Sequence, residues 1–149
     1  MGRSTSDLLS RHYGLVAKDL LTPVLDVFGA ARSTFDGDIE KAIVLLEVVV
    51  RTLQNQGFAE ADLPTLLSGG AYPKVSTNMR SISDSSGIPK ETVRRKVAGL
   101  VEDGLILRDG NELSLSPAAA PALTPIRNAV LKLAMRNYES IAGLKRRDN

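Results

Sequence analysis

Four basic side chains lie within one short stretch of this chain, and their chemistry is the most specific that the sequence offers. Lys90, Arg94, Arg95 and Lys96 follow directly after Ile88-Pro89. An ammonium or a guanidinium donates several hydrogen bonds to phosphate oxygens, and a guanidinium also fits two acceptors on one base edge. This grouping predicts recognition of a phosphate-bearing polymer by binding, without a covalent step.

Apolar residues in the same stretch predict a helix with one face turned inward. Val93, Val97, Leu100 and Val101 repeat at helical intervals and form the predicted core face. At about 3.6 residues per turn, Arg95 points away from that face. Thr92 lies beside Arg95, Arg94 and Lys96 flank it, and Ala98 with Gly99 leaves the outer face small. A solvated basic face is the simpler alternative, and the neighbouring elements decide against it.

Residues that could support catalysis or bind a metal are scarce. The chain has no cysteine, which excludes disulfides, thiolate chemistry and zinc-thiolate sites. Its single histidine, His12, has no triad partners around it, and no GxxxxGK[ST] phosphate loop occurs. Asp36, Asp38 and Glu40 suit the N-terminus of a following helix better than a metal cluster. The sequence therefore predicts no enzyme, no catalytic residue, no cofactor and no metal.

The elements around the basic stretch are predicted to position it. A helix capped by Ser76 or Thr77 carries Met79 and Ile82 on one face and ends at Gly87, where glycine permits a sharp turn. Ile88 fills the angle, and Pro89 pre-sets the first turn of the basic helix. Two short strands then flank Asp109-Gly110-Asn111, a typical hairpin loop with Arg108 and Asn111 near its tip.

Helical segments are predicted on both sides of this unit. We expect four regions within one domain: N-terminal helices at 7–56, an irregular connection at 57–75, the basic unit at 76–116, and a C-terminal helix with a basic tail at 117–149. The clearest N-terminal helix spans 38–54. Thr22-Pro23 reads as a helix restart, and 29–37 as a connection. The predicted fold class is mainly α with a small β-hairpin.

Charge is distributed unevenly along the chain, although the net charge is only +2. Residues 7–73 hold five basic and nine acidic side chains, whereas residues 74–108 hold seven basic and four acidic. Positive charge thus gathers on the basic unit, as a phosphate-facing surface requires. The start MGRSTSD has no apolar run, and no stretch approaches the ~20 residues that span a bilayer. We expect a cytoplasmic protein without membrane contact.

The segment GIPKETVRRKVAGLVEDGLILRDGNELSLSP resembles the winged helix-turn-helix of bacterial transcriptional regulators of the IclR, MarR and GntR kind. The resemblance covers 76–116, and departs from the usual pattern at Ser83 and at Pro89. It implies a sequence-specific regulator of transcription that binds double-stranded DNA, with recognition helix 89–103 in the major groove. The residues expected to contact DNA are Thr77, Lys90, Glu91, Thr92, Arg94, Arg95, Lys96, Arg108 and Asn111. A winged helix that docks on a protein and binds no DNA is the alternative.

The flanking helices predict a second kind of partner. A long apolar-striped helix runs from Pro125 towards Gly143, beyond the hairpin, and further helices precede the unit. This arrangement resembles the dimerising architecture of MarR-like regulators and predicts a homodimer that reads a palindrome. A small-molecule effector is conceivable between the N-terminal helices and the basic unit, but no set of converging polar residues identifies its site or its chemistry.

Overall fold

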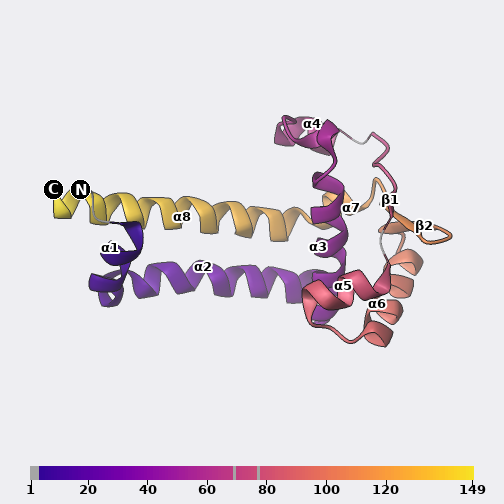
Figure 1. Cartoon of the computed structure of the whole chain (residues 1–149), viewed down its shortest axis with the longest axis horizontal. Coiled ribbons are helices and arrows are strands. Elements are labelled where there is room, and N and C mark those ends of the chain that lie inside the picture. Colours follow the sequence, from indigo (N-terminus) through magenta and orange to yellow (C-terminus); the bar gives the residue numbers. More distant parts are fainter. Residues whose placement is uncertain (1–3, 69, 77) are drawn as a thin grey trace.

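The chain is mainly helical with one small antiparallel sheet. The computed structural model describes residues 4–68, 70–76 and 78–149. These residues form eight α-helices, one short 3-10 helix and three strands, arranged as a compact body and a projecting pair of long helices (Figure 1). The expected fold class, mainly α with a β-hairpin, is confirmed at this level.

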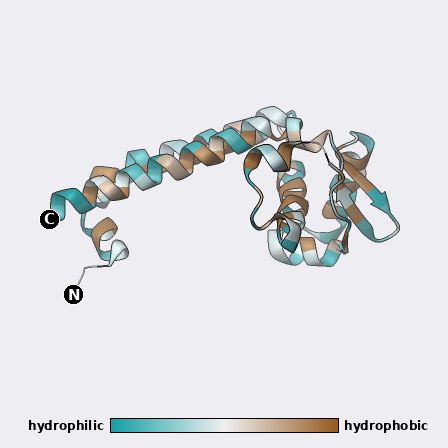
Figure 2. Ribbon diagram, turned by 90° about the horizontal axis from the view of Figure 1, so that it is seen from above, coloured by the Kyte–Doolittle hydropathy of each residue, from teal (hydrophilic) through white to brown (hydrophobic). Residues whose placement is uncertain are grey.

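The projecting part, which we call the stalk, consists of α1 (Thr5–Arg11), α2 (Tyr13–Thr34) and α8 (Thr124–Asp148). Helix α2 runs towards the compact body and α8 runs away from it, so the two pack side by side and antiparallel (Figure 1). Arg11 donates a hydrogen bond of 3.1 Å to Asp148, which holds α1 against the far end of α8. Apolar and polar residues alternate along the projecting helices (Figure 2).

Helix α2 corrects two predictions made from sequence. It passes through Pro23 without a restart and continues to Thr34, so the predicted connection at 29–37 is wrong over most of its length. Proline removes one backbone donor, but Pro23 is buried and α2 packs along α8, which compensates for the lost bond. The true corner is short: Asp36 and Gly37 adopt φ of 52° and 91°, and Asp38 caps the next helix.

The compact body is built around α3 (Ile39–Leu53), α5 (Met79–Ser86) and α6 (Lys90–Glu102). Strands β2 (Ile106–Asp109) and β3 (Glu112–Leu115) form the predicted hairpin, and β1 (Val75–Ser76) pairs with β3 to give the order β1-β3-β2. The core is formed by fully buried side chains from all these helices and the sheet: Val44, Leu45, Val48, Ile82, Val93, Val97, Leu100, Ile106 and Leu113. One continuous core therefore fixes α6 against α3, α5 and the sheet.

Local backbone chemistry explains how α5 and α6 are joined. Asn78 caps α5 by accepting the Ser81 N–H at 2.8 Å, where sequence favoured Ser76 or Thr77 as the cap. Gly87 ends α5 with φ of 74°, as expected of a glycine at such a turn. Pro89 lies just before the first residue of α6. Val101 was expected in the core and is 36% exposed, because it lies at the edge of the face that Val93, Val97 and Leu100 bury.

The segment predicted as an irregular connection is more ordered than expected. It contains the 3-10 helix η1 (Gln56–Phe58), α4 (Leu63–Leu67) and strand β1. A further short helix, α7 (Ala119–Ala122), leads from the sheet into α8. None of the described helices has both the length and the apolar character that crossing a membrane would require.

Candidate nucleic-acid interface

The N-terminal half of α6 presents a polar, positively charged surface. Lys90, Glu91, Arg94 and Arg95 are exposed, and Thr92 is half-buried. Among the described residues, Arg95 makes no hydrogen bond and no ion pair, so its guanidinium keeps its donors for an external acceptor. The opposite face of α6 is fully buried through Val93, Val97 and Leu100, which orients the exposed face rigidly.

A hollow of about 360 Å³ lies where the start of α5, the start of α6 and the hairpin meet. Three cationic side chains line it: Arg80 from α5, Lys90 from α6 and Arg108 from β2. Asn78 and Asn111 add side-chain amides, and no carboxylate lies in the lining. Asp84, outside the lining, lies 4.0 Å from Arg80 on a well-exposed part of α5. An excess of positive charge together with amide donors forms a surface suited to a phosphate group.

The hollow brings together residues that are far apart in the sequence. Lys90, Arg108 and Asn111 were predicted separately as DNA contacts, and they line one concave surface. Arg108 donates to the Gly110 carbonyl at 3.0 Å, which uses one of its five N–H donors and orients its side chain along the hairpin.

Arg94 is already paired in the isolated chain. Its guanidinium donates to both carboxylate oxygens of Glu91 one helical turn earlier, with Nε at 3.1 Å from each. The hydrogen bond from Arg94 holds the pKa of the Glu91 carboxyl below its ordinary value, with smaller effects from the Arg95 and Lys90 charges. A phosphate that binds Arg94 has to compete with Glu91, so this pair reduces the strength of any contact made by Arg94.

Lys96 is placed differently from the other predicted contacts. Its ammonium lies 2.7 Å from Asp38 and 4.0 Å from Glu40 at the start of α3, and its side chain is only 20% exposed. Burial alone would raise the pKa of Asp38, but hydrogen bonds from Lys96 and the Lys41 N–H, with both charges, lower it overall. Lys96 therefore ties α6 to α3 in this structure.

Gly99, which was expected to leave the outer face small, lies instead towards α3. A Cβ built on it would meet the Lys41 Nζ at 3.4 Å. Lys41 in turn forms an ion pair with Asp103, just beyond the end of α6. Two lysines thus join α3 and α6: Lys96 pairs with Asp38 and Glu40, and Lys41 pairs with Asp103. Gly99 leaves room for the Lys41 side chain.

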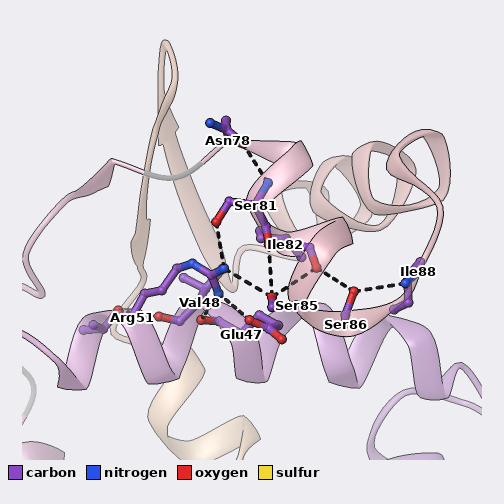
Figure 3. Close-up of polar contacts among 10 residues, drawn as sticks. Glu47, Val48, Arg51, Asn78, Ser81, Ile82, Ser85, Ser86 and Ile88 are labelled. Atoms are coloured by element: carbon purple, nitrogen blue, oxygen red, sulfur yellow. Dashed lines mark hydrogen bonds and ion pairs between the residues drawn. The ribbon is translucent and has the colours of Figure 1, made fainter.

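A polar network joins α3 to α5, the helix whose first residues border the hollow. Arg51 of α3 pairs with Glu47 and reaches across to Ser81 at 3.0 Å and Ser85 at 3.3 Å (Figure 3). Both serines lie on α5, on the side that faces α3 (Figure 3). The network holds α5 against α3, beside the hollow.

The hairpin carries less positive charge than the helices. Lys74 pairs with Asp109 at 2.6 Å and lies 3.8 Å from Glu112, so one cation serves two acids at its base. The hydrogen bond with Lys74 lowers the pKa of Asp109, and the same bond raises the pKa of Lys74. Arg108 remains the cation that the hairpin directs into the hollow. The predicted contact at Thr77 lies outside the described residues.

No protein-family model, curated protein or solved structure matches this chain. Function must therefore be inferred from the geometry and charge of the surface itself. Within residues 4–68, 70–76 and 78–149, no group of three or more His, Asp or Glu side chains is placed to hold a metal ion. Of the acids considered as a metal cluster, Asp38 caps α3 and pairs with Lys96.

Sequence reasoning did not identify Arg80 or Asn78 as part of the surface. Arg80 follows Met79, a residue on the inward face of α5, so helical periodicity alone places it near the exposed side. The missing information was tertiary: nothing in the sequence specifies that the start of α5 lies beside Lys90 and Arg108.

Proposed function

We propose that this protein is a sequence-specific transcriptional regulator that binds double-stranded DNA through a winged helix-turn-helix. In this assignment α3, α5 and α6 are the three helices, β1 with the β2–β3 hairpin forms the sheet and wing, and α6 enters the major groove. The element order and the sheet order β1-β3-β2 support it.

The observation that carries the proposal is the cationic hollow beside the exposed start of α6. Arg80, Lys90 and Arg108 line it, and no carboxylate lies in the lining. Asp84 lies 4.0 Å from Arg80 on α5 and offsets part of that one charge, while Lys90 and Arg108 keep theirs for an external anion. A polyanion gains most from such a site, because each phosphate neutralised also releases bound counterions. In a groove-bound complex, the hollow would hold the DNA backbone while the adjoining face of α6 reads base edges.

The roles of individual residues follow from exposure and pairing. Arg95 and Thr92 contact bases, because Arg95 is exposed and without a protein partner. The phosphate contacts are Lys90, Arg80 and Arg108, joined by Arg94 once it leaves Glu91, with Asn111 at the wing. Lys96 is left out of this interface, because Asp38 already occupies its ammonium.

Selection of duplexes from a random pool, followed by titration of the selected duplex at several salt concentrations, tests the proposal. We expect log K to fall linearly with log salt, and the slope to decrease by about 0.9 for each of Arg80→Gln, Lys90→Gln and Arg108→Gln. Lys132→Gln, on the exposed surface of α8, is the matched control and should leave the slope unchanged. Failure to bind any duplex at low salt would refute DNA binding.

A protein-interaction winged helix is the second candidate. The observation that favours it is the mixed charge of the surface, where Glu91 pairs with Arg94 and Lys74 pairs with Asp109. Such alternating charges suit a protein partner with charges of both signs. Absence of duplex binding, together with a partner whose binding is lost in Arg95→Glu, would favour this function over DNA binding.

We further propose that two copies of the chain associate through the stalk. Both long helices leave an apolar stripe exposed with spacing i, i+4, i+7, and its side chains are 47% to 74% exposed. We call this set the stalk stripes: Leu21, Leu25 and Phe28 on α2, and Leu131, Met135 and Tyr138 on α8. Two antiparallel helix pairs with such stripes can form a four-helix bundle.

The area that the stalk stripes expose supports this association. Six large side chains at these exposures present on the order of 800 Å² per chain, which is the usual contribution of one partner to a specific interface. Light scattering should give twice the chain mass, and Leu25→Glu should give the monomer mass. Ser33→Glu adds the same charge on α2 outside the stripe and should remain dimeric. A monomeric parent chain at micromolar concentration would refute this association.

A further inference from the structure

An apolar cavity of about 320 Å³ lies between α3, α4, α7 and the start of α8. Leu46 and Val49 of α3 form one wall, Leu66 of α4 forms the lid, and Leu123 with Ile126 forms the floor at the start of α8. Tyr72 donates its hydroxyl to the Leu66 carbonyl at 3.0 Å, which fixes the lid segment. The single hydrogen of the Tyr72 hydroxyl is used in this bond, and the walls of the cavity are almost entirely apolar.

One charged side chain, Arg127 of α8, lines this cavity. Its guanidinium donates to the Ala120 carbonyl at 2.8 Å and to the Thr124 hydroxyl at 3.3 Å. Both acceptors are neutral, and no carboxylate among the described residues pairs with Arg127. Guanidinium has five N–H donors, so three remain for another acceptor. A positive charge held at the edge of an apolar cavity is complementary to an anion with an apolar body.

We propose that this cavity binds an amphipathic organic anion, with its apolar part between α3 and α4 and its carboxylate on Arg127. Ligand cavities in proteins have about 300–1,000 Å³, so this one suits a small ligand. An apolar cavity of about 150 Å³ accommodates benzene. Twice that volume accommodates a fused bicyclic ring or a medium-length hydrocarbon chain. The lid, built from η1 and α4, is the part of the wall that a ligand would displace on entry.

Isothermal titration calorimetry with 2-naphthoate, on the full chain and without DNA, tests this site. Because the measurement involves no DNA, its failure and a failure of the proposed DNA binding are distinguishable. The neutral comparator is 2-naphthalenemethanol, which has the same ring system without the charge.

Two sets of variants test the walls of the cavity and its charge. Ala120→Phe fills the cavity from the edge, and Ala118→Phe is its control, because Ala118 is exposed and outside the lining. Arg127→Gln removes the charge, Arg127→Lys keeps it, and Arg136→Gln is the control on exposed α8.

We expect one naphthoate per chain with a Kd below about 1 mM. Ala120→Phe should abolish binding. Arg127→Gln should weaken it at least tenfold, as the loss of a charge-assisted hydrogen bond predicts, roughly to the affinity of the neutral comparator. Arg127→Lys should restore most of it.

Two results would overturn the proposal. The first is equal affinity for naphthoate and the neutral alcohol, or an Arg127→Gln variant that binds as the parent chain does. The second is no naphthoate binding by the folded parent chain. In that second case, a change from dimer to monomer mass in Ala120→Phe would show that a second copy fills the cavity. If Ala120→Phe does not fold, the Arg127 variants and the neutral comparator still decide the question.

Discussion

The ion pair between Lys96 and Asp38 gives the sharpest test of which basic residues face a ligand. If Lys96 acts within the protein, Lys96→Met should lower the free energy of unfolding and leave the salt dependence of DNA binding unchanged. The two side chains are 20% and 32% exposed, between a surface pair and a buried one. A surface pair contributes about 0–1 kcal/mol and a hydrogen bond to a charged group about 1.5–3 kcal/mol. Discounting for solvent screening, we expect a loss of about 1 kcal/mol.

Thermal unfolding and DNA titration measure the two effects separately. A loss of about 1 kcal/mol in a chain of this size lowers the Tm by about 3 °C. Lys90→Met is the matched comparison on the same helix, because Lys90 is exposed and lies in the cationic hollow. It should leave the Tm nearly unchanged and lower the salt slope by about 0.9.

A double-mutant cycle identifies the partner of Lys96. Asp38→Asn removes the charge and keeps a residue that caps helices well, so the cap on the Lys41 N–H is retained. If the pair is direct, the effects of Lys96→Met and Asp38→Asn should be non-additive by at least about 0.5 kcal/mol. The reasoning is refuted if Lys96→Met leaves the Tm unchanged and lowers the salt slope by about one contact, because Lys96 would then face phosphate.

Three further predictions concern single residues. Arg95→Ala should weaken binding to the selected duplex by about 1–3 kcal/mol and relax base preference at one position, with an unchanged Tm; affinity equal to that of the parent would contradict the orientation assigned to α6. Gly87→Ala should lower the free energy of unfolding by about 1–2 kcal/mol, because its φ of 74° strains any side chain even though the space around it is open. Gly29→Ala is the control: Gly29 is an open helical position of α2, and this change should not destabilise the protein. The pKa of Asp38 is lowered in the folded protein, so its ionised form stabilises the fold above the unfolded-state pKa near 4, and this contribution is lost as the pH falls below it. The difference in free energy of unfolding between the parent and Asp38→Asn should therefore shrink below about pH 4 in acid denaturation curves.

The parts of the fold that sequence predicted well are those that local patterns determine. Helix α3, the glycine turn at Gly87, helix α6 and the β2–β3 hairpin each have a period, a cap or a turn residue that specifies them. The hairpin register follows from the alternation of buried Leu113 and Leu115 with Ser114. Strand β1 was missed because two residues carry too little pattern to be recognised, and pairing with β3 is what makes them a strand.

The remaining differences arise from contacts between distant segments. Pro23 and Gly29 have low helix propensity, and packing of α2 along α8 overrides it. Lys96 was predicted to flank the exposed face of the helix and to contact DNA, and no local pattern indicates that Asp38 lies beside it. In the same way, Arg80 joins the candidate site through tertiary placement alone.

The corner between α2 and α3 connects the two proposed functions of the molecule. Asp36 and Gly37 both have positive φ, and the following Asp38 accepts the Lys41 N–H and pairs with Lys96 of α6. One residue therefore fixes where the stalk ends and where the proposed recognition helix lies. In a two-fold dimer joined through the stalk stripes, the direction of α6 relative to the stalk sets the separation of the two recognition helices. Reading successive major grooves requires a separation of about 34 Å. Loosening this corner in Asp38→Asn should consequently reduce discrimination between half-site spacings more than affinity for a single half-site.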